Sequence, residues 1–260
     1  RPVLCNDTHL NLTVPGTWYV NHLFSKDGYH CTGSTMPGFP GILLGHNEHI
    51  AWGITLAYTD VEDIFVENIN VSNPDQYEYK GKLLEFDIIE ESISVKGQSD
   101  HKEKVRRTIH GPLIGAVTEH ENQNIAICSK SLQPNTIMEG FFNINHAFDW
   151  DEFSAGIEKI KSPQLNIVYS DISGNIGLYV SGRVPIRNKG KGDLPVPGWT
   201  GEYDWHSEIN HADMPHSFNP DCGFIISCNN KITDEKYPYY LGNSFMNGYR
   251  AARIEKKFIN

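Results

Sequence analysis

Residues 45–67 read GHNEHIAWGITLAYTDVEDIFVE, and the fold prediction starts from this stretch. At its centre, AWGIT at residues 51–55 is a short apolar run of the kind that forms a buried strand. His46, in the GHN triplet before the run, is typical of a structural residue that ties down a turn. A cluster of three carboxylates follows the run, and its usual interpretation is a solvated turn: Asp60, Glu62 and Asp63.

The composition is that of an ordinary globular protein. Apolar residues make up 39% and charged residues 21% of the 260 residues, and a chain of this size can bury a sizeable core. The net charge of −10 argues against nucleic acid, because phosphate binding needs clustered Lys and Arg. No apolar run approaches the ~18 residues of a membrane-spanning helix, and no signal peptide is visible. We expect neither a nucleic acid nor a membrane as partner.

Cysteine spacing excludes two common sites. None of the five cysteines forms a CxxC pair, so neither a zinc knuckle nor a redox pair is indicated. The odd count leaves at least one thiol free if the others pair. The cysteines do not indicate in which cellular compartment the protein works. They are Cys5, Cys31, Cys128, Cys222 and Cys228.

Strand patterns dominate the first half of the chain. A turn at residues 25–28 separates two short runs and predicts a hairpin. Residues 84–95 alternate apolar and acidic side chains, as in a half-exposed strand. The expected strands lie at residues 17–24, 29–35, 84–95, 105–109, 124–128, 166–169, 177–180 and 223–227.

Two segments have helical spacing. Residues 149–160 carry apolar side chains on one face, with Asp149 as a plausible N-cap, and residues 247–258 form a polar-faced helix at the end of the chain. We expect an α+β fold with an antiparallel sheet and helices on its outside. Residues 1–260 are expected to form a single partial domain, because both ends look cut from something longer.

Asn229 is the first candidate for chemistry. It and Asn230 directly follow the apolar run 223–227, where a side chain can be held rigidly. A neutral amide suits an oxyanion because it offers N–H without a proton that can be lost. The sequence Asn-Asn after a strand is also common turn chemistry, and the residues alone favour the turn. Arg250 and Arg253 share a helical face, where arginines are usually surface residues.

Short motifs follow one another in order over nearly the entire chain. They are CNDTHL at 5–10, residues 45–67, RTIHGP at 107–112, YSD at 169–171, GNIG at 174–177, LPVPGWTGEYDW at 194–205, and the pair Asn229-Asn230 followed by Arg250. Together they resemble the amidase chain of the penicillin acylase family, a family of N-terminal-nucleophile hydrolases. The resemblance implies stacked antiparallel sheets flanked by helices (αββα) and cleavage of amides by an N-terminal serine.

In that family the nucleophile is the first residue of the mature chain and lies ahead of the first motif. Arg1 already stands within that motif region. The resemblance therefore implies a nucleophile upstream of this sequence and a companion chain from the same precursor. We expect these 260 residues alone to be inactive.

The resemblance also implies roles for residues. The side-chain N–H of Asn229 and the main-chain N–H of Leu56 would stabilise the oxyanion. Arg250 would orient Asn229 or bind a substrate carboxylate through its planar fork. His9 occupies a position close to the nucleophile, where a neutral imidazole can hydrogen-bond the free α-amine. Taken by itself, His9 is more often a satisfied structural histidine.

Substrate positions follow from the same resemblance. Leu10, Leu44 and Ile54 match residues that line the acyl pocket in the family, and their aliphatic side chains favour an apolar acyl group. Family members acting on cephalosporin side chains or acyl-homoserine lactones tend to have His at the position of His9. The expected function is a penicillin amidase-like acylase, with a cephalosporin or acyl-homoserine lactone acylase as the alternative. The family favours a periplasmic or secreted location.

Calcium is the one cofactor that the resemblance suggests. Several family members bind Ca²⁺ with two side chains that match Asp60 and Asp63 and a backbone carbonyl that matches Glu62. Calcium requires six to eight oxygen ligands, and Gly192 stands where the family has a proline carbonyl. No organic cofactor is expected.

Other functions are less well supported by the residues. The close histidines are His46 with His49 and the group His206, His211 and His216, and the latter could bind zinc. There is no GxSxG elbow or glycine-rich phosphate loop. A non-catalytic β-rich scaffold or binding fragment is the remaining alternative, but it has no need of Asn229 together with Arg250.

Overall fold

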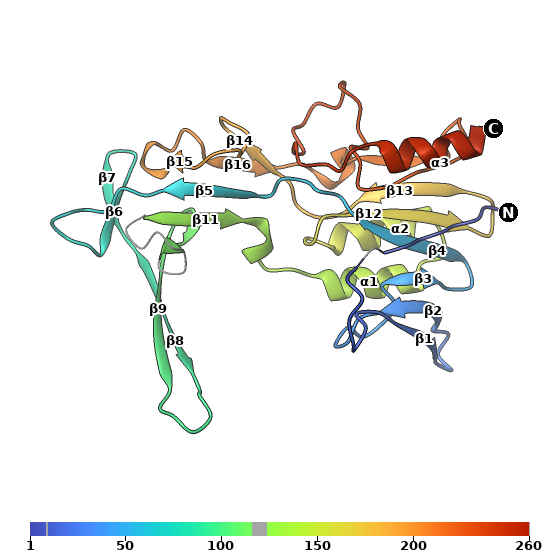
Figure 1. The fold of residues 1–260 in the computed structure, drawn as a ribbon, viewed down its shortest axis with the longest axis horizontal. Coiled ribbons are helices and arrows are strands. Elements are labelled where there is room, and N and C mark those ends of the chain that lie inside the picture. The colour runs from blue at the N-terminus through green and yellow to red at the C-terminus, as the bar shows by residue number, and fades with distance from the viewer. Residues whose placement is uncertain (9, 116–123, 260) are drawn as a thin grey trace. The chain divides into compact units, whose positions relative to one another are not determined.

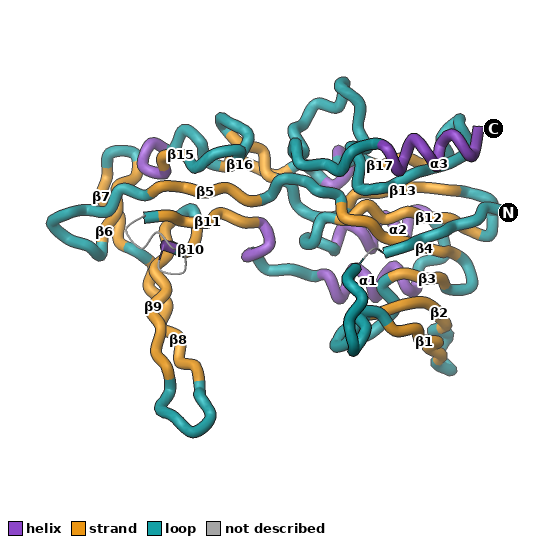
Figure 2. Tube along the Cα trace, viewed as in Figure 1, coloured by secondary structure: helices purple, strands orange, loops and turns teal. Residues whose placement is uncertain are grey.

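The structure is a computed structural model that describes residues 1–8, 10–115 and 124–259 (Figures 1 and 2). The chain divides into two compact units, which are described separately. Unit 1 consists of residues 1–59, 134–184 and 209–260, and unit 2 consists of residues 60–133 and 185–208. The sequence predicts a single domain over residues 1–260, and that boundary stays a prediction.

Unit 1 is built on one antiparallel sheet. Seven strands of the described residues pair in the order β1-β2-β3-β4-β12-β13-β17. The predicted hairpin is confirmed, since β1 and β2 pair antiparallel with Tyr19 opposite Thr35. The strands are β1 (Tyr19–Phe24), β2 (His30–Thr35), β3 (Leu44–His46), β4 (Ile50–Leu56), β12 (Leu165–Asp171), β13 (Ile176–Val180) and β17 (His216–Phe218).

Helices α1 (Ile137–His146) and α2 (Trp150–Lys159) lie side by side in unit 1 (Figure 1). They approach closely because both carry glycine at the crossing: a Cβ added to Gly140 would lie 2.9 Å from the Gly156 carbonyl oxygen. The expected N-cap is confirmed, since the Asp149 carboxylate accepts from two amides of the first turn of α2. The third helix, α3 (Tyr249–Ile259), confirms the predicted terminal helix.

The aromatic ring of Trp150 seats α2 on the sheet. It contacts Tyr169 of β12 at 5.3 Å, Tyr179 of β13 at 5.9 Å and Phe218 of β17 at 4.8 Å between ring centroids. A Cβ on Gly177 would lie 2.2 Å from this ring, so only glycine fits there. The core of unit 1 therefore lies between the helices and this face of the sheet.

The turn at GHN is tied down by Asn47 more than by His46. Asn47 Oδ1 accepts from the amides of His49 and Ile50 at 2.8 Å, and its Nδ2 donates to the carbonyl oxygen of Ala147 at 2.8 Å. His46 is exposed and makes only a local bond to the Asn47 carbonyl at 3.0 Å. The Asn47 side chain uses its acceptor and its donor together, and so ties the turn to the backbone at Ala147.

Unit 2 consists of small sheets. The described strands pair in the orders β10-β9-β8, β11-β5-β15, β14-β16 and β6-β7. β8 and β9 form a long two-stranded hairpin (Figure 1). The strands are β5 (Glu62–Val66), β6 (Gln76–Tyr79), β7 (Lys82–Glu85), β8 (Asp87–Ile93), β9 (His101–Thr108), β10 (Gly111–Pro112), β11 (Ile125–Ser129), β14 (Pro185–Arg187), β15 (Val196–Pro197) and β16 (Trp205–Glu208). The short 3₁₀ helices are η2 (Lys130–Leu132) and η3 (Gly198–Thr200) in unit 2, and η4 (His211–Asp213) in unit 1.

Two strand predictions are wrong. Residues 84–95 do not form one strand but contribute to β7 and β8, which belong to different sheets. Residues 223–227 have no regular secondary structure, although their apolar pattern is that of a strand. Side chains take the place of ladder partners at the end of this segment: the Cys228 amide donates to Asn230 Oδ1 at 3.0 Å. Asn229 has a left-handed backbone with φ of 61°, which a continuing strand does not allow.

Candidate active site

The ladder between β4 and β12 decides where the Leu56 N–H points. The Ala57 amide donates to the Gln164 carbonyl oxygen at 3.1 Å, and Leu56 stands opposite Leu165 in the register. Hydrogen-bonded and non-hydrogen-bonded pairs alternate along an antiparallel ladder. The Leu56 N–H therefore points away from β12, toward the edge of β4 on the side of β3.

Asn6 lies along this same edge of β4, two residues earlier on the strand. Its Oδ1 accepts from the Ile54 amide at 3.0 Å, and its Nδ2 donates to the Ile54 carbonyl oxygen at 3.0 Å. Gly53 makes room for it, because a Cβ there would lie 2.8 Å from the Asn6 Cβ. The motif residue Asn6 is thus bonded to β4 two residues before Leu56.

Asn229 comes from a distant part of the chain to the end of β4. Its Nδ2 donates to the Leu56 carbonyl oxygen at 3.0 Å. A side-chain amide carries two hydrogens on this nitrogen, and no other described residue accepts the second one. The left-handed backbone at Asn229 is one that Asn tolerates better than most residues. The end of β4 therefore presents two neutral N–H donors, one from the main chain and one from a side chain.

Arg250, at the start of α3, fixes the orientation of the Asn229 amide. Its Nη2 donates to Asn229 Oδ1 at 2.9 Å and to the Cys228 carbonyl oxygen at 2.6 Å. Because the guanidinium only donates, the amide oxygen faces Arg250 and the amide nitrogen faces Leu56. The neighbouring Arg253 is exposed. Of the two roles expected for Arg250, orienting Asn229 is the one with contacts.

The expected pocket residues are not all on one face of the sheet. Gly45 pairs with Trp52 in the register of β3 and β4, and successive side chains alternate between faces. Ile54 consequently shares a face with Trp52, whereas Leu44 is on the opposite face. Leu10 follows the Asn6 segment and is 51% exposed. His9 lies outside the described residues.

In unit 2, the expected calcium carboxylates hold an arginine. Arg187 of β14 donates from Nε to Asp63 Oδ2 at 2.8 Å and from Nη2 to Asp63 Oδ1 at 2.7 Å. Its Nη2 also lies 3.3 Å from Asp60 Oδ1. The side chains of Arg187 and Asp63 are each 4% exposed. Burial raises the pKa of Asp60, and the charge of Arg187 opposes that rise.

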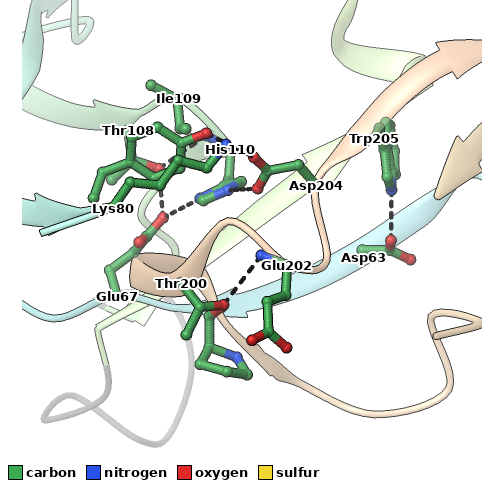
Figure 3. A network of polar contacts seen from close by, with 12 residues as sticks. Asp63, Glu67, Lys80, Thr108, Ile109, His110, Thr200, Glu202, Asp204 and Trp205 are labelled. Carbon is green, nitrogen blue, oxygen red and sulfur yellow. Dashed lines mark hydrogen bonds and ion pairs between the residues drawn. The ribbon is translucent and has the colours of Figure 1, made fainter. Parts of the chain in front are cut away.

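These residues by themselves do not fit a calcium ion. The second oxygen of Asp63 also accepts from Trp205 Nε1 at 2.5 Å (Figure 3), and the Glu62 carboxylate accepts from Ser129 at 2.8 Å. Within residues 1–8, 10–115 and 124–259, no group of three or more His, Cys, Asp or Glu side chains is arranged to hold a metal. A calcium ion here would need Arg187 to share its carboxylates and further oxygen ligands to join them.

A buried histidine in unit 2 connects three of the motifs (Figure 3). His110 Nδ1 lies 2.8 Å from Glu67 Oε1, and His110 Nε2 lies 3.1 Å from Asp204 Oδ1. Its ring stacks on Phe65 at 3.9 Å, and Thr108 donates to the same Glu67 oxygen at 2.7 Å. The ring is thus held between two carboxylates, with one at each nitrogen. We interpret this network as structural.

The other histidine groups do not converge on a metal site. His211 and His216 both stack on the Tyr179 ring, at 4.5 Å and 4.9 Å between centroids, and His206 is exposed. Burial lowers the pKa of His211.

All five cysteines are free thiols. None of the helices in the described part of the chain has the length and apolar content that crossing a membrane requires.

Four polar residues join the site that the sequence did not single out: Asn6, Thr55, Asn166 and Ser227. Thr55, Asn166 and Ser227 each lie within two positions of Leu56 or Asn229, along the chain or across the β4–β12 ladder. Asn6 lies in the CNDTHL motif, three positions before His9. The four side chains bond to one another or to the backbone of β4. Position near a motif or site residue was the only available signal, and it does not say which neighbour points inward.

Comparisons with known proteins identify the family. The family model described as penicillin amidase matches residues 1–258. The chain is 31% identical to the acyl-homoserine lactone acylase QuiP of Pseudomonas aeruginosa, over 98% of the chain and 31% of that protein. It is also 31% identical to the penicillin acylase 2 proenzyme of Pseudomonas sp. strain SE83, over 100% of the chain and 33% of that protein.

A solved structure gives the same result for the fold. The thermostable penicillin G acylase of Alcaligenes faecalis superposes with a TM-score of 0.78 at 26% identity, over 94% of this chain and 44% of that one. This match confirms the α+β class and the resemblance to N-terminal-nucleophile hydrolases. The chain spans about a third of the length of the curated relatives it matches. It belongs to the penicillin amidase family.

Proposed function

We propose that this chain supplies the oxyanion-stabilising part of the active site of an amide-hydrolysing acylase. The observation that carries the proposal is the meeting of the Asn229 amide with the end of β4 at Leu56, 3.0 Å apart. Two neutral donors at one point suit the negative charge that gathers on a carbonyl oxygen when an amide is attacked. Arg250 supports this role by holding the Asn229 oxygen.

The reaction in this proposal runs through an acyl-enzyme. An N-terminal serine hydroxyl attacks the amide carbonyl, its proton passing to the serine's own α-amine, and the C–O bond forms as the carbonyl becomes an oxyanion. The Leu56 N–H and the Asn229 Nδ2–H stabilise that oxyanion. The C–N bond then breaks, the proton goes to the leaving amine, and water hydrolyses the acyl-enzyme. In this proposal the serine is the first residue of a chain made by self-cleavage of a precursor.

The proposed substrate is an N-acyl amide with an apolar acyl group. The exposed Leu10 and Ile54, on the strand that ends at the oxyanion site, favour an aliphatic acyl chain. Leu44 lies on the other face of the sheet from Ile54, so these two side chains do not contact the same acyl group. The relatives named above act on penicillins or acyl-homoserine lactones by their names. Both classes join an acyl group to an amine through an amide.

The test uses the complete protein that contains this chain. It is purified, its chains are identified by mass spectrometry, and it is assayed on penicillins and acyl-homoserine lactones of graded acyl length. We expect a serine at the N-terminus of the processed chain and hydrolysis of at least one apolar substrate. A chain without a nucleophilic N-terminus, inactive on every member of the panel, would instead support a non-catalytic scaffold.

A further inference from the structure

Two hydroxyl side chains connect the segments that carry the proposed oxyanion donors. Thr55 comes one residue before Leu56, and Ser227 comes two residues before Asn229. Their Oγ atoms lie 2.6 Å apart, although 172 positions separate them in the chain. Residues 223–227 belong to no described strand. This side-chain bond therefore does there what a ladder bond does elsewhere in the sheet.

Asn166, on the neighbouring strand β12, binds the same Thr55 hydroxyl. It stands opposite Thr55 in the β4–β12 register and is 1% exposed. Its Nδ2 donates to Thr55 Oγ1 at 3.2 Å and lies 3.4 Å from the Leu56 carbonyl oxygen. Thr55 Oγ1 accepts from Asn166, and either hydroxyl can be the donor between Thr55 and Ser227. The three side chains form a continuous chain of hydrogen bonds.

The Asn166 side chain is held in this orientation at a cost. Its Oδ1 is buried and has no hydrogen-bond partner among the described residues. An unsatisfied buried carbonyl oxygen is destabilising, because it has lost its hydrogen bonds to water. An aliphatic residue would avoid that cost, but it would leave Thr55 and the Leu56 carbonyl without this donor. Asn166 therefore holds the end of β4 in place, although its own unsatisfied oxygen lowers the stability of the fold.

The Leu56 carbonyl brings the two sets of contacts together. The Leu56 carbonyl oxygen accepts from Asn229 Nδ2 at 3.0 Å. It also lies 3.4 Å from Asn166 Nδ2. Any shift of the Ser227 segment moves Asn229 relative to the Leu56 N–H. The distance between the two N–H donors affects the rate, because both donors must point at the position that the oxyanion occupies in the transition state.

We propose that Asn166, Thr55 and Ser227 form a hydrogen-bonded staple that sets the spacing of the two oxyanion donors. This inference rests on the proposed function and adds positioning residues to it. The staple acts through Leu56 and Asn229 and does not itself touch the reacting atoms. Misplacing catalytic groups by about 1 Å can lower a rate on the order of 10²-fold.

The test measures Thr55→Val, Ser227→Ala and the double variant in the complete protein. Each single variant should lower kcat about 10- to 100-fold with little change in KM, because ground-state binding does not use the donors. The double variant should be no slower than the slower single variant, since both changes remove one bond. The affinity for a boronic acid that mimics the tetrahedral state should fall by the same factor as kcat.

Thr35→Val is the matched control. Thr35 is 0% exposed and its hydroxyl donates to the Phe39 carbonyl oxygen at 3.3 Å in the same sheet. This variant should lose stability and keep its kcat. Normal kcat in both staple variants, with an active wild type, would overturn the staple and leave the acylase function standing. A wild type inactive on every amide would overturn the function, and the staple's catalytic role with it.

Discussion

The Asn229 side-chain nitrogen lies 3.0 Å from the carbonyl oxygen of Leu56, across 173 positions of the chain. Leu56 is the last residue of β4, and Asn229 lies two residues after the apolar run 223–227. Together they place a side-chain N–H beside a main-chain N–H that the β4–β12 ladder leaves unused. An acylase needs such a pair where its oxyanion forms.

Removing the Asn229 amide should abolish most of the activity without unfolding the protein. We expect Asn229→Ala to lower kcat by about 10²–10³-fold, as loss of one oxyanion donor does elsewhere. Because φ is 61° at this position, alanine also adds backbone strain. Asn229→Gly removes the amide without that strain. Equal losses in the two variants would assign the effect to the amide, whereas a near-normal rate in Asn229→Gly would remove Asn229 from the oxyanion site.

Arg250 should act through Asn229. Arg250→Met leaves the Asn229 oxygen and the Cys228 carbonyl without their shared donor, so the amide can rotate. We expect kcat to fall about 10-fold or more and KM to change much less. Arg253→Met on the same helix is the control, because the bonds to Asn229 and Cys228 come from Arg250 and not from Arg253. A change confined to KM would mean that Arg250 binds substrate directly.

The ion pair of Arg187 with Asp63 should be a major stabilising contact of unit 2. Arg187→Met leaves a buried carboxylate unpaired, which typically costs about 3–5 kcal/mol. Lys189→Met is the control: its pair with Glu202 is exposed at 58% and 56%, and exposed ion pairs contribute little to stability. Denaturant unfolding measures both. Similar losses in the two variants would contradict a special role for Arg187.

Calcium binding at Asp60, Glu62 and Asp63 stays a prediction, and the variant Arg187→Met tests it. Without Arg187 the two carboxylates lack a cation, so added calcium should raise the melting temperature of Arg187→Met more than that of the wild type. A rise in the wild type that chelator reverses would show that the ion binds beside Arg187. No effect of calcium on either protein would remove this metal site.

Asp204 should make unit 2 sensitive to acid. Burial alone would raise the pKa of Asp204, but hydrogen bonds from Tyr79, His110 and Lys80 bring it below its usual value of 3.8. A lowered folded pKa means that the stabilisation is present above the unfolded pKa and is lost as pH falls through the folded one. We expect the free energy of unfolding to drop below about pH 4, and the drop to be smaller in Asp204→Asn. An unchanged pH profile in that variant would contradict the assignment.

The sequence predicted the elements whose pattern is local. The β1–β2 hairpin, the Asp149 cap of α2 and the terminal helix α3 were all visible, because turn chemistry, capping and periodicity act within a few residues. The motifs from CNDTHL to Arg250 also identified the family. The strand expected at 223–227 failed because the side chain of Asn230 and the left-handed backbone of Asn229 override an apolar pattern.

Which side chains meet was decided by tertiary structure. Periodicity could not show that Arg187 would reach the Asp60 and Asp63 carboxylates, or that Thr55 would bond to Ser227, since such contacts depend on strand order and register. Register likewise separates Leu44 from Ile54. The amino-acid sequence by itself determined the family and the residue types at the site. Their distances came from the fold, because hydrogen bonds and ion pairs depend on positions that distant segments acquire only when the sheet assembles.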